Sequence, residues 1–249
     1  MTVKLMIGDC LYRMREIEDG SVDLILTDPP YGTTSCKWDS IIPLDLMWKQ
    51  INRVIKKNGA IVMTASQPFT SILGYSNITE LKYSWIWLKS RSTGHLNAKK
   101  MPMKSFEDIL VFYKKLPTYN PQGIIYKPTK VMNSKSHSLR NSQNTTSTVS
   151  GGIIHKEYLQ EYTNYPRQHL SFSNDGKTVH PTQKPVALME YLIKTYTNEN
   201  ETVLDFAMGS VTTGIGCKNL NRNFIGIEKD NEYFEIAKNR ISASTGCEI

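Results

Sequence analysis

The sequence is poor in cysteine and in long apolar runs, and both shortages exclude whole classes of protein. Only 4 of the 249 residues are cysteine, and none of them has Cys-x-x-Cys spacing or a nearby histidine pair. This argues against a disulfide framework and against a zinc site, and the 5 histidines show no metal-binding spacing either. No window approaches the roughly 18 consecutive apolar residues that a membrane-spanning helix needs, so we expect no membrane partner.

The first residues lack the pattern of a secretion signal. They run straight into a strand-like segment, without the basic, apolar and small-residue regions of a signal peptide. We therefore expect a cytoplasmic protein. Its length and its hydrophobic content of 39% suit one large globular domain, or a compact domain that carries an insertion.

Acidic residues are scarce in the middle of the chain. Residues 81–180 hold 15 Lys plus Arg against 5 Asp plus Glu, whereas the remainder holds 15 against 18. The net charge of +7 therefore comes from the middle of the chain. A polyanionic partner that contacts this region is one interpretation, and a solvated surface that keeps the protein soluble is the other.

Apolar periodicity predicts alternating strands and helices towards both ends of the chain. Strands are expected at 3–7, 22–27, 60–64, 83–88, 109–113, 202–206 and 223–228, and helices at 11–17, 44–55, 185–196, 212–220 and 231–241. Lys57-Asn58-Gly59 is expected to close the second helix, with the glycine just beyond its end. Such alternation is typical of a parallel α/β sheet.

Regular patterns are missing between residues 116 and 177. The stretch 133–152 is dominated by Ser, Thr, Asn and Gly and has no apolar period. Long stretches of this kind are usually functional loops or disordered segments. We therefore expect a single α/β domain over residues 1–249, with a polar and basic insertion at 90–180.

Asp28-Pro29-Pro30-Tyr31 directly follows the predicted strand at 22–27. In an open α/β sheet, ligands and catalytic groups gather at the carboxyl ends of strands. The two prolines fix the backbone and remove two N–H donors, so nearby carbonyls can serve as fixed acceptors. The Asp28 carboxylate and the Pro29 carbonyl can accept from an exocyclic amino group, while Tyr31 stacks on the ring that bears it. The alternative is a proline turn that closes the strand, with Asp28 as its cap.

A strand, a turn of small residues and a helix follow one another at residues 203–214. Such a turn lets a ligand approach the backbone, and the helix N-terminus favours a carboxylate or phosphate. Asp205 can hold the ammonium group of an amino-acid-like ligand, and Glu228, at the end of the next strand, can hold ribose hydroxyls. The pattern predicts a nucleoside ligand, although similar turns also occur in α/β cores that bind none.

Together these motifs resemble the β class of the DNA adenine-N6/cytosine-N4 amino-methyltransferases, over nearly the whole chain. In that class an Asp-Pro-Pro-Tyr motif comes first, a target-recognition region follows, and the cofactor motif comes last. Further segments that look like the family are residues 8–10, 96–99, 107–112, 180–185 and 223–228. Several matching motifs in the right order are more specific than any one of them.

The resemblance implies a Rossmann-like methyltransferase sheet and S-adenosylmethionine as the cofactor. Asp28-Pro29-Pro30-Tyr31 then forms the catalytic motif, Asp9 contacts the adenine side of the cofactor and Lys184 its methionine carboxylate. The expected cofactor-binding residues are Asp9, Thr182, Gln183, Lys184, Asp205, Phe206, Ala207, Gly209, Ser210, Thr212, Thr213 and Glu228. The alternatives are a helix cap for Asp9 and a solvated lysine at a helix start for Lys184.

One position departs from the family pattern, because Val211 stands where the cofactor turn usually has a second glycine. A β-branched residue there restricts the backbone, and we expect it to add bulk near the methionine moiety. Cofactor binding is therefore expected to be retained but weakened.

The resemblance implies methyl transfer to N6 of an adenine flipped out of double-stranded DNA, by direct displacement. The chain lacks the Pro-Cys dipeptide that C5-cytosine methylation would require. Adenine is favoured because cytosine-N4 enzymes of the family more often carry Ser where Asp28 stands. The alternatives are a cytosine-N4 enzyme, methylation of a glutamine amide or an RNA base, and a DNA-binding protein with a decayed site.

The insertion at 90–180 is the candidate region for sequence recognition. Its basic side chains can contact phosphates, while Asn, Gln and Ser side chains reach base edges. The candidate phosphate contacts are Lys99, Lys100, Lys104, Lys127, Lys130, Lys135 and Arg140. Trp48, Trp85 and Trp87 are interpreted as core residues. The resemblance also implies a homodimer and a place in a restriction–modification pair.

Overall fold

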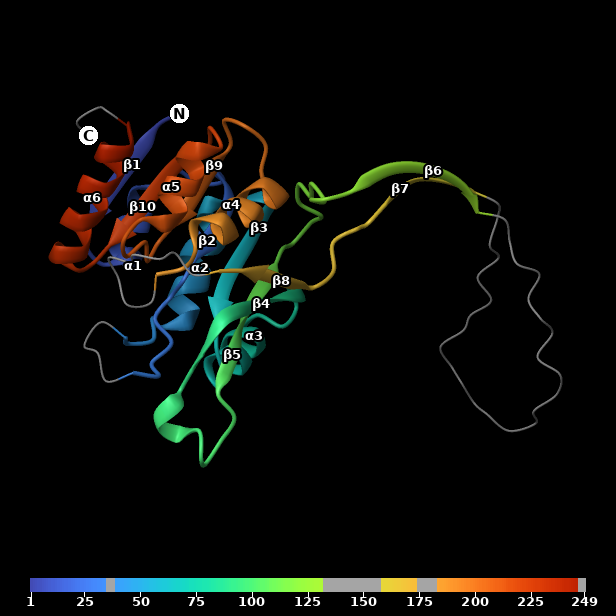
Figure 1. Ribbon diagram of the computed structural model, residues 1–249. Coiled ribbons are helices and arrows are strands. Elements are labelled where there is room, and N and C mark those ends of the chain that lie inside the picture. Colours follow the sequence, from blue (N-terminus) through green and yellow to red (C-terminus); the bar gives the residue numbers. More distant parts are fainter. Residues whose placement is uncertain (35–38, 132–157, 174–182, 246–249) are drawn as a thin grey trace. The chain divides into compact units, whose positions relative to one another are not determined.

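The computed structural model describes residues 1–34, 39–131, 158–173 and 183–245 (Figure 1). The chain divides into two compact units. Unit 1 comprises residues 1–120 and 167–249, and unit 2 comprises residues 121–166. The helices of the described residues and the large sheet belong to unit 1.

Unit 1 is built on an eight-stranded sheet with the order β1-β10-β9-β2-β3-β5-β4-β8. Its strands are β1 (Val3–Ile7), β2 (Val22–Thr27), β3 (Ile55–Ala65), β4 (Leu81–Thr93), β5 (Lys104–Phe112), β8 (His169–Phe172), β9 (Thr202–Asp205) and β10 (Asn223–Glu228). All pairs from β1 to β3 are parallel, as the alternating pattern predicts, and β8 is parallel to β4. Only β5 runs against its neighbours, β3 and β4.

Helices pack against both faces of this sheet (Figure 1). They are α1 (Cys10–Arg13), α2 (Leu44–Val54), α3 (Phe69–Ser76), α4 (Val186–Tyr196), α5 (Thr212–Asn219) and α6 (Asn231–Thr245), with 3-10 turns η1 (Met14–Glu16) and η2 (His95–Asn97). Ile25 of β2 packs with residues of α1 to α3, whereas Leu24 and Leu26 pack with residues of α4 to α6. Successive strand residues point to opposite faces, so a strand buried on both sides is apolar throughout. None of the described helices is long and apolar enough to cross a membrane.

Strand β9 lies beside β2 although the two strands come from opposite ends of the chain. Leu24 pairs with Val203 and Ile25 with Leu204. The side chain of Asp23 stabilises the pairing of β2 with β9, because its Oδ2 accepts a hydrogen bond from the Thr202 amide at 2.9 Å. The carboxyl ends of β2 and β9 therefore meet at one edge of the sheet, at the point where the strand order reverses. Open α/β sheets bind their ligands at such a point.

The predicted strands and helices towards both ends of the chain are present, with bounds shifted by a few residues or, for some strands, extended. The prediction that Lys57-Asn58-Gly59 closes a helix is wrong, since α2 ends at Val54 and these residues lie in β3. The pairing with β2 shifts from Val22–Ile55 to Leu24–Ala60, which leaves them in a bulge. A Cβ on Gly59 would lie 2.6 Å from Ile55 Cδ1, so the glycine permits close packing rather than a helix end.

Neither helix α3 nor strand β8 was predicted from the apolar pattern. Strand β8 lies in the stretch 116–177, for which no regular structure was predicted. The same stretch contains the two strands of unit 2, β6 (Ile125–Val131) and β7 (Tyr158–Thr163), which pair antiparallel. The rings of Tyr126 and Tyr162 meet edge to face across this pair, with centroids 5.4 Å apart. Both side chains are exposed, so no buried face imposes an alternating pattern on these strands. The predicted loop at 133–152 lies outside the described residues.

Val211 has an unusual backbone conformation for a β-branched residue. Its φ of 63° and ψ of 31° are left-handed, and its side chain is fully buried. Left-handed backbone costs a non-glycine residue roughly 1–2 kcal/mol. Its Cγ2 lies 2.6 Å from the position that a Cβ on Gly214 would take, so the valine fills space that this glycine leaves.

We expect Val211→Gly to lower the free energy of unfolding by about 1–2 kcal/mol. Loss of the buried valine side chain destabilises the folded state by roughly 1.5–3 kcal/mol. The greater conformational entropy of glycine in the unfolded chain adds a loss of about 0.5–1 kcal/mol. Relief of the left-handed strain offsets about 1–2 kcal/mol of this total. Val62→Gly is the matched control, because Val62 is equally buried but lies in regular strand β3. It should cost about 3 kcal/mol or more in urea unfolding. Equal losses for the two variants would contradict the strain at Val211.

Candidate active site

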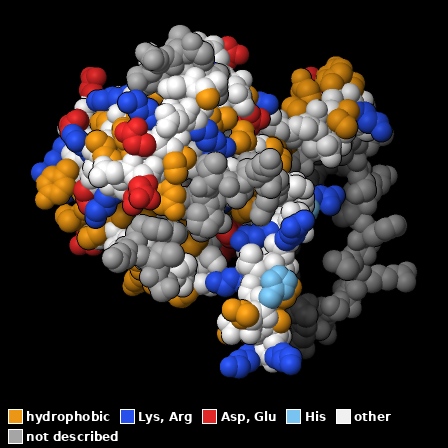
Figure 2. Space-filling model, turned by 60° about the vertical axis from the view of Figure 1, so that its left-hand side comes forward, with side chains coloured by type: hydrophobic (Ala, Val, Ile, Leu, Met, Phe, Trp, Pro, Cys, Tyr) orange, Lys and Arg blue, Asp and Glu red, His pale blue; other side chains and the backbone are white. Residues whose placement is uncertain are grey.

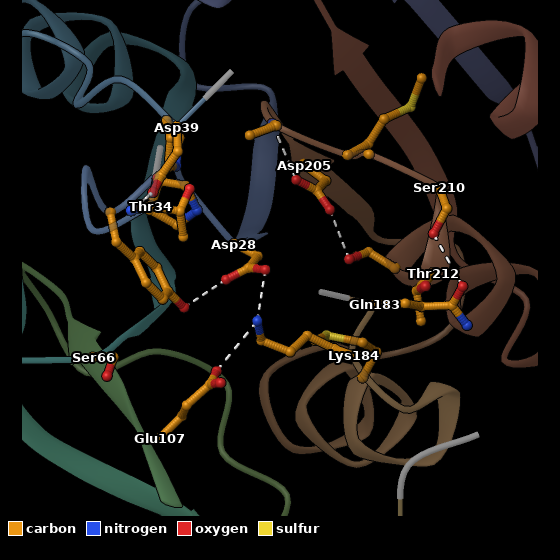
Figure 3. A pocket seen from close by; sticks show the side chains of 18 of the residues that line it. Asp28, Thr34, Asp39, Ser66, Glu107, Gln183, Lys184, Asp205, Ser210 and Thr212 are labelled. Atoms are coloured by element: carbon orange, nitrogen blue, oxygen red, sulfur yellow. Dashed lines mark hydrogen bonds and ion pairs between the residues drawn. The ribbon is translucent and has the colours of Figure 1, made fainter. Parts of the chain in front are cut away.

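A cavity of about 420 Å³ opens where the carboxyl ends of β2 and β9 meet (Figure 3). Its wall comes from the segments after β2, β3, β9 and β10, from β4 and β5, and from the residues just before α4. The predicted residues that line it are Asp28, Pro29, Pro30, Tyr31, Gln183, Lys184, Asp205, Ala207, Gly209, Ser210, Thr212, Thr213 and Glu228. The fold thus brings the two predicted motifs to one cavity.

Two of the predicted cofactor residues that the structure describes, Phe206 and Asp9, are not in this wall. The side chain of Phe206 packs in the core and is 2% exposed. Asp9 caps α1, since its Oδ1 accepts from the Leu11 amide at 2.9 Å, which confirms the cap weighed for it. Its contact with the cofactor stays a prediction. Thr182 lies outside the described residues.

Asp28 receives hydrogen bonds from three separate segments of the chain. Tyr31 Oη donates to Asp28 Oδ1 at 2.6 Å, and Thr64 Oγ1, from β3, donates to the same oxygen. Lys184 Nζ donates to Oδ2 at 2.6 Å. A carboxylate offers roughly four acceptor positions, so these donors leave about one for a group in the cavity.

Lys184 lies between two carboxylates and is only 6% exposed. Besides Asp28, its Nζ lies 3.2 Å from Glu107 Oε2, an ion-pair contact without hydrogen-bond geometry. The other oxygen of Glu107 pairs with Lys89. Charges of alternating sign therefore run from Lys89 through Glu107 and Lys184 to Asp28, as the dashed lines in Figure 3 show for the last three. The solvated position weighed for Lys184 is wrong, and its contact with a methionine carboxylate stays a prediction.

These contacts keep Asp28 and Lys184 charged. Burial raises the pKa of Asp28, but the ammonium of Lys184 and the hydrogen bonds lower it by more. The net result is a pKa below the ordinary value of the group. Burial lowers the pKa of Lys184, but Asp28 and Glu107 bring it above its ordinary value. The pKa of Tyr31 is far above its usual range because of burial and these carboxylates, so its hydroxyl keeps the proton that it donates to Asp28.

The ring of Tyr31 stacks on Phe69, with the centroids 5.4 Å apart and an interplanar angle of 21°. The ammonium of Lys184 lies 5.8 Å from the centroid of the Tyr31 ring. One ring face is therefore covered by Phe69, and the hydroxyl is committed to Asp28. Stacking of Tyr31 on a base stays a prediction, limited to the face that Phe69 does not cover.

Asp205 is buried with both carboxylate oxygens hydrogen bonded. Its Oδ1 accepts from Thr27 Oγ1 at 2.7 Å and from the Ala207 amide at 3.2 Å, and its Oδ2 accepts from Thr213 Oγ1 at 2.7 Å. Burial raises the pKa of Asp205 to about 6, although these hydrogen bonds oppose the shift. Asp205 therefore changes charge between pH 5 and pH 7.

The turn after β9 is held by residues from β10 and α6. Glu228 Oε2 accepts from the Gly209 amide at 2.8 Å. Arg240 Nη1 donates to the carbonyl of Ser210 at 2.8 Å and to Thr212 Oγ1 at 3.1 Å. Burial raises the pKa of Glu228 above its usual value. Arg240 fixes the turn from a distant helix, which the sequence did not indicate.

Val211 does not line the cavity, and its side chain belongs to the core cluster beneath the turn. Its side chain therefore adds no bulk to the cavity, and its effect on cofactor binding stays a prediction. Val211 still differs from the glycine of the family pattern in one respect at the site. Its backbone is left-handed, a conformation that a glycine would adopt without strain.

Sequence reasoning also missed Asp39, which shapes the loop after Tyr31. Its carboxylate accepts from the amides of Gly32, Thr33 and Thr34 at 2.8, 2.9 and 2.7 Å. The other missed residues around the two motifs are Thr64, Lys89, Glu107 and Arg240. Glu107 opens a segment that looked like the family, but no spacing in the sequence connected it to the first motif.

The candidate phosphate contacts are spread over both units. Lys99 and Lys100 are exposed on the connection between β4 and β5, and Lys104 lies at the cavity wall. In unit 2, Lys127 is exposed and Lys130 lies in β6. Lys135 and Arg140 lie outside the described residues. Trp48, Trp85 and Trp87 are core residues, as interpreted, although Trp87 also reaches the cavity wall.

Comparison with solved structures places the fold. The chain is similar to the crystal structure of an M1.HpyAVI–SAM complex, with a TM-score of 0.63, 29% identity, and coverage of 96% of this chain and 100% of that one. It also resembles PvuII DNA methyltransferase, described as cytosine-N4-specific, with a TM-score of 0.68 over 95% of this chain and 85% of that one. The 17% identity to PvuII methyltransferase supports the fold alone. The expected methyltransferase sheet is confirmed.

Sequence relatives point the same way. Type II methyltransferase M.HpaI of Haemophilus parainfluenzae is 29% identical over 98% of this chain and 75% of its own length. DNA adenine methyltransferase YhdJ of Escherichia coli (strain K12) is 28% identical over 96% of this chain and 82% of its own length. The family model described as DNA methylase matches residues 22–239, most of the chain. The chain therefore belongs to the N6/N4 DNA methylase family.

Proposed function

We propose that this protein transfers the methyl group of S-adenosylmethionine to N6 of an adenine in double-stranded DNA. Family membership supports methyl transfer to DNA. The relative named as a DNA adenine methyltransferase, at 28% identity, supports adenine. The observation that carries the proposal is the charged Asp28 carboxylate, aimed into the cavity beside the second motif and held by Lys184, Tyr31 and Thr64.

S-adenosylmethionine is the cofactor, and it supplies a methyl group activated by a sulfonium. The residues of the second motif fit this molecule. Asp205 offers a carboxylate for its ammonium group, Glu228 offers one for ribose hydroxyls, and the N-terminus of α5 favours its carboxylate. The small residues Ala207 and Gly209 leave the backbone of the turn open to a ligand in the cavity.

Asp28 orients the amino group that receives the methyl. The lone pair of an exocyclic amino nitrogen is delocalised into the ring, and a hydrogen bond to Asp28 favours the pyramidal form in which that lone pair is free. Because Lys184 holds the pKa of Asp28 below its ordinary value, the carboxylate is a weak base. It therefore acts as a fixed hydrogen-bond acceptor while the methyl group is transferred. The methylated nitrogen is then cationic and strongly acidic, so even a weak base such as Asp28 can accept its proton and pass it to solvent. Lys184, Tyr31 and Thr64 act as positioning residues.

The region 90–180 is proposed to recognise the target sequence. The region contributes to both units: the long β4–β5 hairpin and β8 belong to unit 1, and the β6–β7 pair belongs to unit 2. Lys99, Lys100 and Lys127 are exposed and available to phosphates. A homodimer stays a prediction.

The purified protein is expected to incorporate labelled methyl groups from S-adenosylmethionine into unmethylated genomic DNA as N6-methyladenine. Asp28→Ala should lower the rate by at least about a hundredfold, the usual effect of removing one group that stabilises a transition state. Nucleoside analysis identifies the product, and calorimetry should show that the variant still binds the cofactor.

Asp45→Ala is the control, because Asp45 is an exposed acid at the start of α2, outside the cavity wall. It should keep the wild-type rate. N4-methylcytosine as product would refute the choice of adenine but keep methyl transfer. Absence of methyl transfer by the wild type would refute the proposal, and an active Asp28→Ala variant would refute the role of Asp28.

Cofactor affinity should fall about tenfold between pH 7 and pH 5. Asp205, with a pKa of about 6, is ionised at pH 7 and neutral at pH 5, where it no longer attracts the ammonium group of the cofactor. Calorimetry at both pH values measures the change. Asp205→Asn should bind weakly at both values and lose most of the dependence.

The free energy of unfolding should change with pH in the opposite direction from cofactor affinity, because the ionisation of Asp205 makes it fall as the pH rises. Because the folded pKa of Asp205 lies above the unfolded value of about 3.9, its contribution to stability is full below that value and is lost as the pH rises through about 6. Glu228, whose pKa is also raised, titrates in the same sense, so Glu228→Gln is compared in parallel. A pH dependence that survives in Asp205→Asn but disappears in Glu228→Gln would assign the effect to Glu228 instead.

A further inference from the structure

Strands β4 and β5 continue beyond the rest of the sheet into a long hairpin. The last residue pair of this hairpin is Thr93 with Lys104, and residues 94–103 form its tip. In Figure 1 the tip projects away from the body of unit 1.

The hairpin tip is a hydrogen-bonded structure rather than a loose loop. Gly94 adopts a left-handed φ of 93° and starts the turn η2. The Asn97 amide donates to the Gly94 carbonyl at 3.0 Å, and the amides of Lys100 and Met101 donate to the Asn97 carbonyl at 2.8 and 3.0 Å. The side chains of the tip are therefore presented on a preformed backbone.

The tip combines positive charge with an apolar point. Residues 88–106 contain five cations, Lys89, Arg91, Lys99, Lys100 and Lys104, and no acidic residue. Figure 2 shows Lys and Arg side chains gathered along this projection. Leu96, in η2, is fully exposed and lies between Arg91 and Lys99 in the sequence. A polyanion complements such a surface, whereas a second copy of the hairpin would be repelled.

The same hairpin forms part of the cavity wall. Trp87, Lys89 and Thr93 of β4 and Lys104 and Glu107 of β5 line the cavity that contains Asp28. Leu96 comes only three residues after Thr93, so its Cα lies within about 11 Å of the cavity wall. A duplex that delivers a base to Asp28 must therefore pass close to the tip.

We propose that the hairpin tip enters a groove of duplex DNA and that Leu96 fills the space that the target base leaves in the stack. This inference rests on the proposed function. The major groove of DNA is about 12 Å wide and admits a two-stranded ribbon. A base must leave the stack to reach a catalytic group inside a cavity, and apolar side chains inserted between bases stabilise the opened stack. The lysines of the tip contact phosphates on either side of the opening.

The test uses a duplex that carries the target site, after the methylated positions in genomic DNA have been mapped by sequencing. 2-Aminopurine replaces the target adenine, or lies beside a target cytosine, and its fluorescence rises when the stack opens. The wild-type protein should increase the fluorescence on binding. Leu96→Ala should reduce this increase at saturation by more than half and slow methyl transfer at least about tenfold, while the Kd for duplex changes less than about threefold.

Leu116→Ala is the matched control, because Leu116 is 76% exposed but lies outside the hairpin. It should leave fluorescence and rate unchanged, and circular dichroism should show both variants folded. Wild-type fluorescence in Leu96→Ala would overturn the proposal. A loss of DNA affinity with full fluorescence at saturation would also overturn it, because Leu96 would then be a simple contact.

A second measurement separates this proposal from the proposed function. Lys100→Gln should reduce the slope of log affinity for a duplex against log salt concentration by about one. Lys57→Gln is the control and should leave the slope unchanged, because Lys57 is exposed near the start of β3, at the end of the strand away from the cavity. Absence of methyl transfer together with this difference in slope would refute the proposed function but keep the tip as a DNA-binding element. An unchanged slope for Lys100→Gln would refute its phosphate contact.

Discussion

Strand β9 pairs with β2 on one side and with β10 on the other, and the site depends on the pairing with β2. It places Asp28, which directly follows β2, and Asp205, the last residue of β9, at one edge of the sheet, although the two residues come from opposite ends of the chain. Thr27, the last residue of β2, donates to Asp205 at 2.7 Å and so connects the two motifs directly. A sheet with β9 elsewhere would contain the same motifs but no common cavity.

Charge is the second constraint on the cavity. Asp28, Glu107, Lys184 and Lys89 alternate in sign within a largely buried wall, so each charge has an opposite neighbour. Removing one member would leave a buried charge without its partner, which is strongly destabilising. The same arrangement holds Asp28 ionised and weakly basic, which suits a group that orients an amino nitrogen. Asp205, without a cation beside it among the contacts described, has its pKa raised instead.

Much of the fold and part of the site follow from local pattern. The strands at 3–7, 22–27 and 223–228 are predicted with the bounds that they have, because each is a short segment rich in apolar and β-branched residues. Most of the residues of the two motifs line the cavity as expected, since they directly follow strands. Where burial is weak, as in β6 and β7, pattern fails because exposed strands need no alternation.

The amino-acid sequence by itself determined the α/β class, the two motifs and the family, because short segments carry these properties. Only the tertiary structure decided which side chains meet Asp28. Thr64 and Lys184 contact Asp28, and Glu107 contacts Lys184. These three residues come from distant segments, and their contacts depend on strand order and register. It also decided that Val211 points into the core and that Gly59 lies in a strand. Such outcomes arise from packing between elements, to which local pattern is blind.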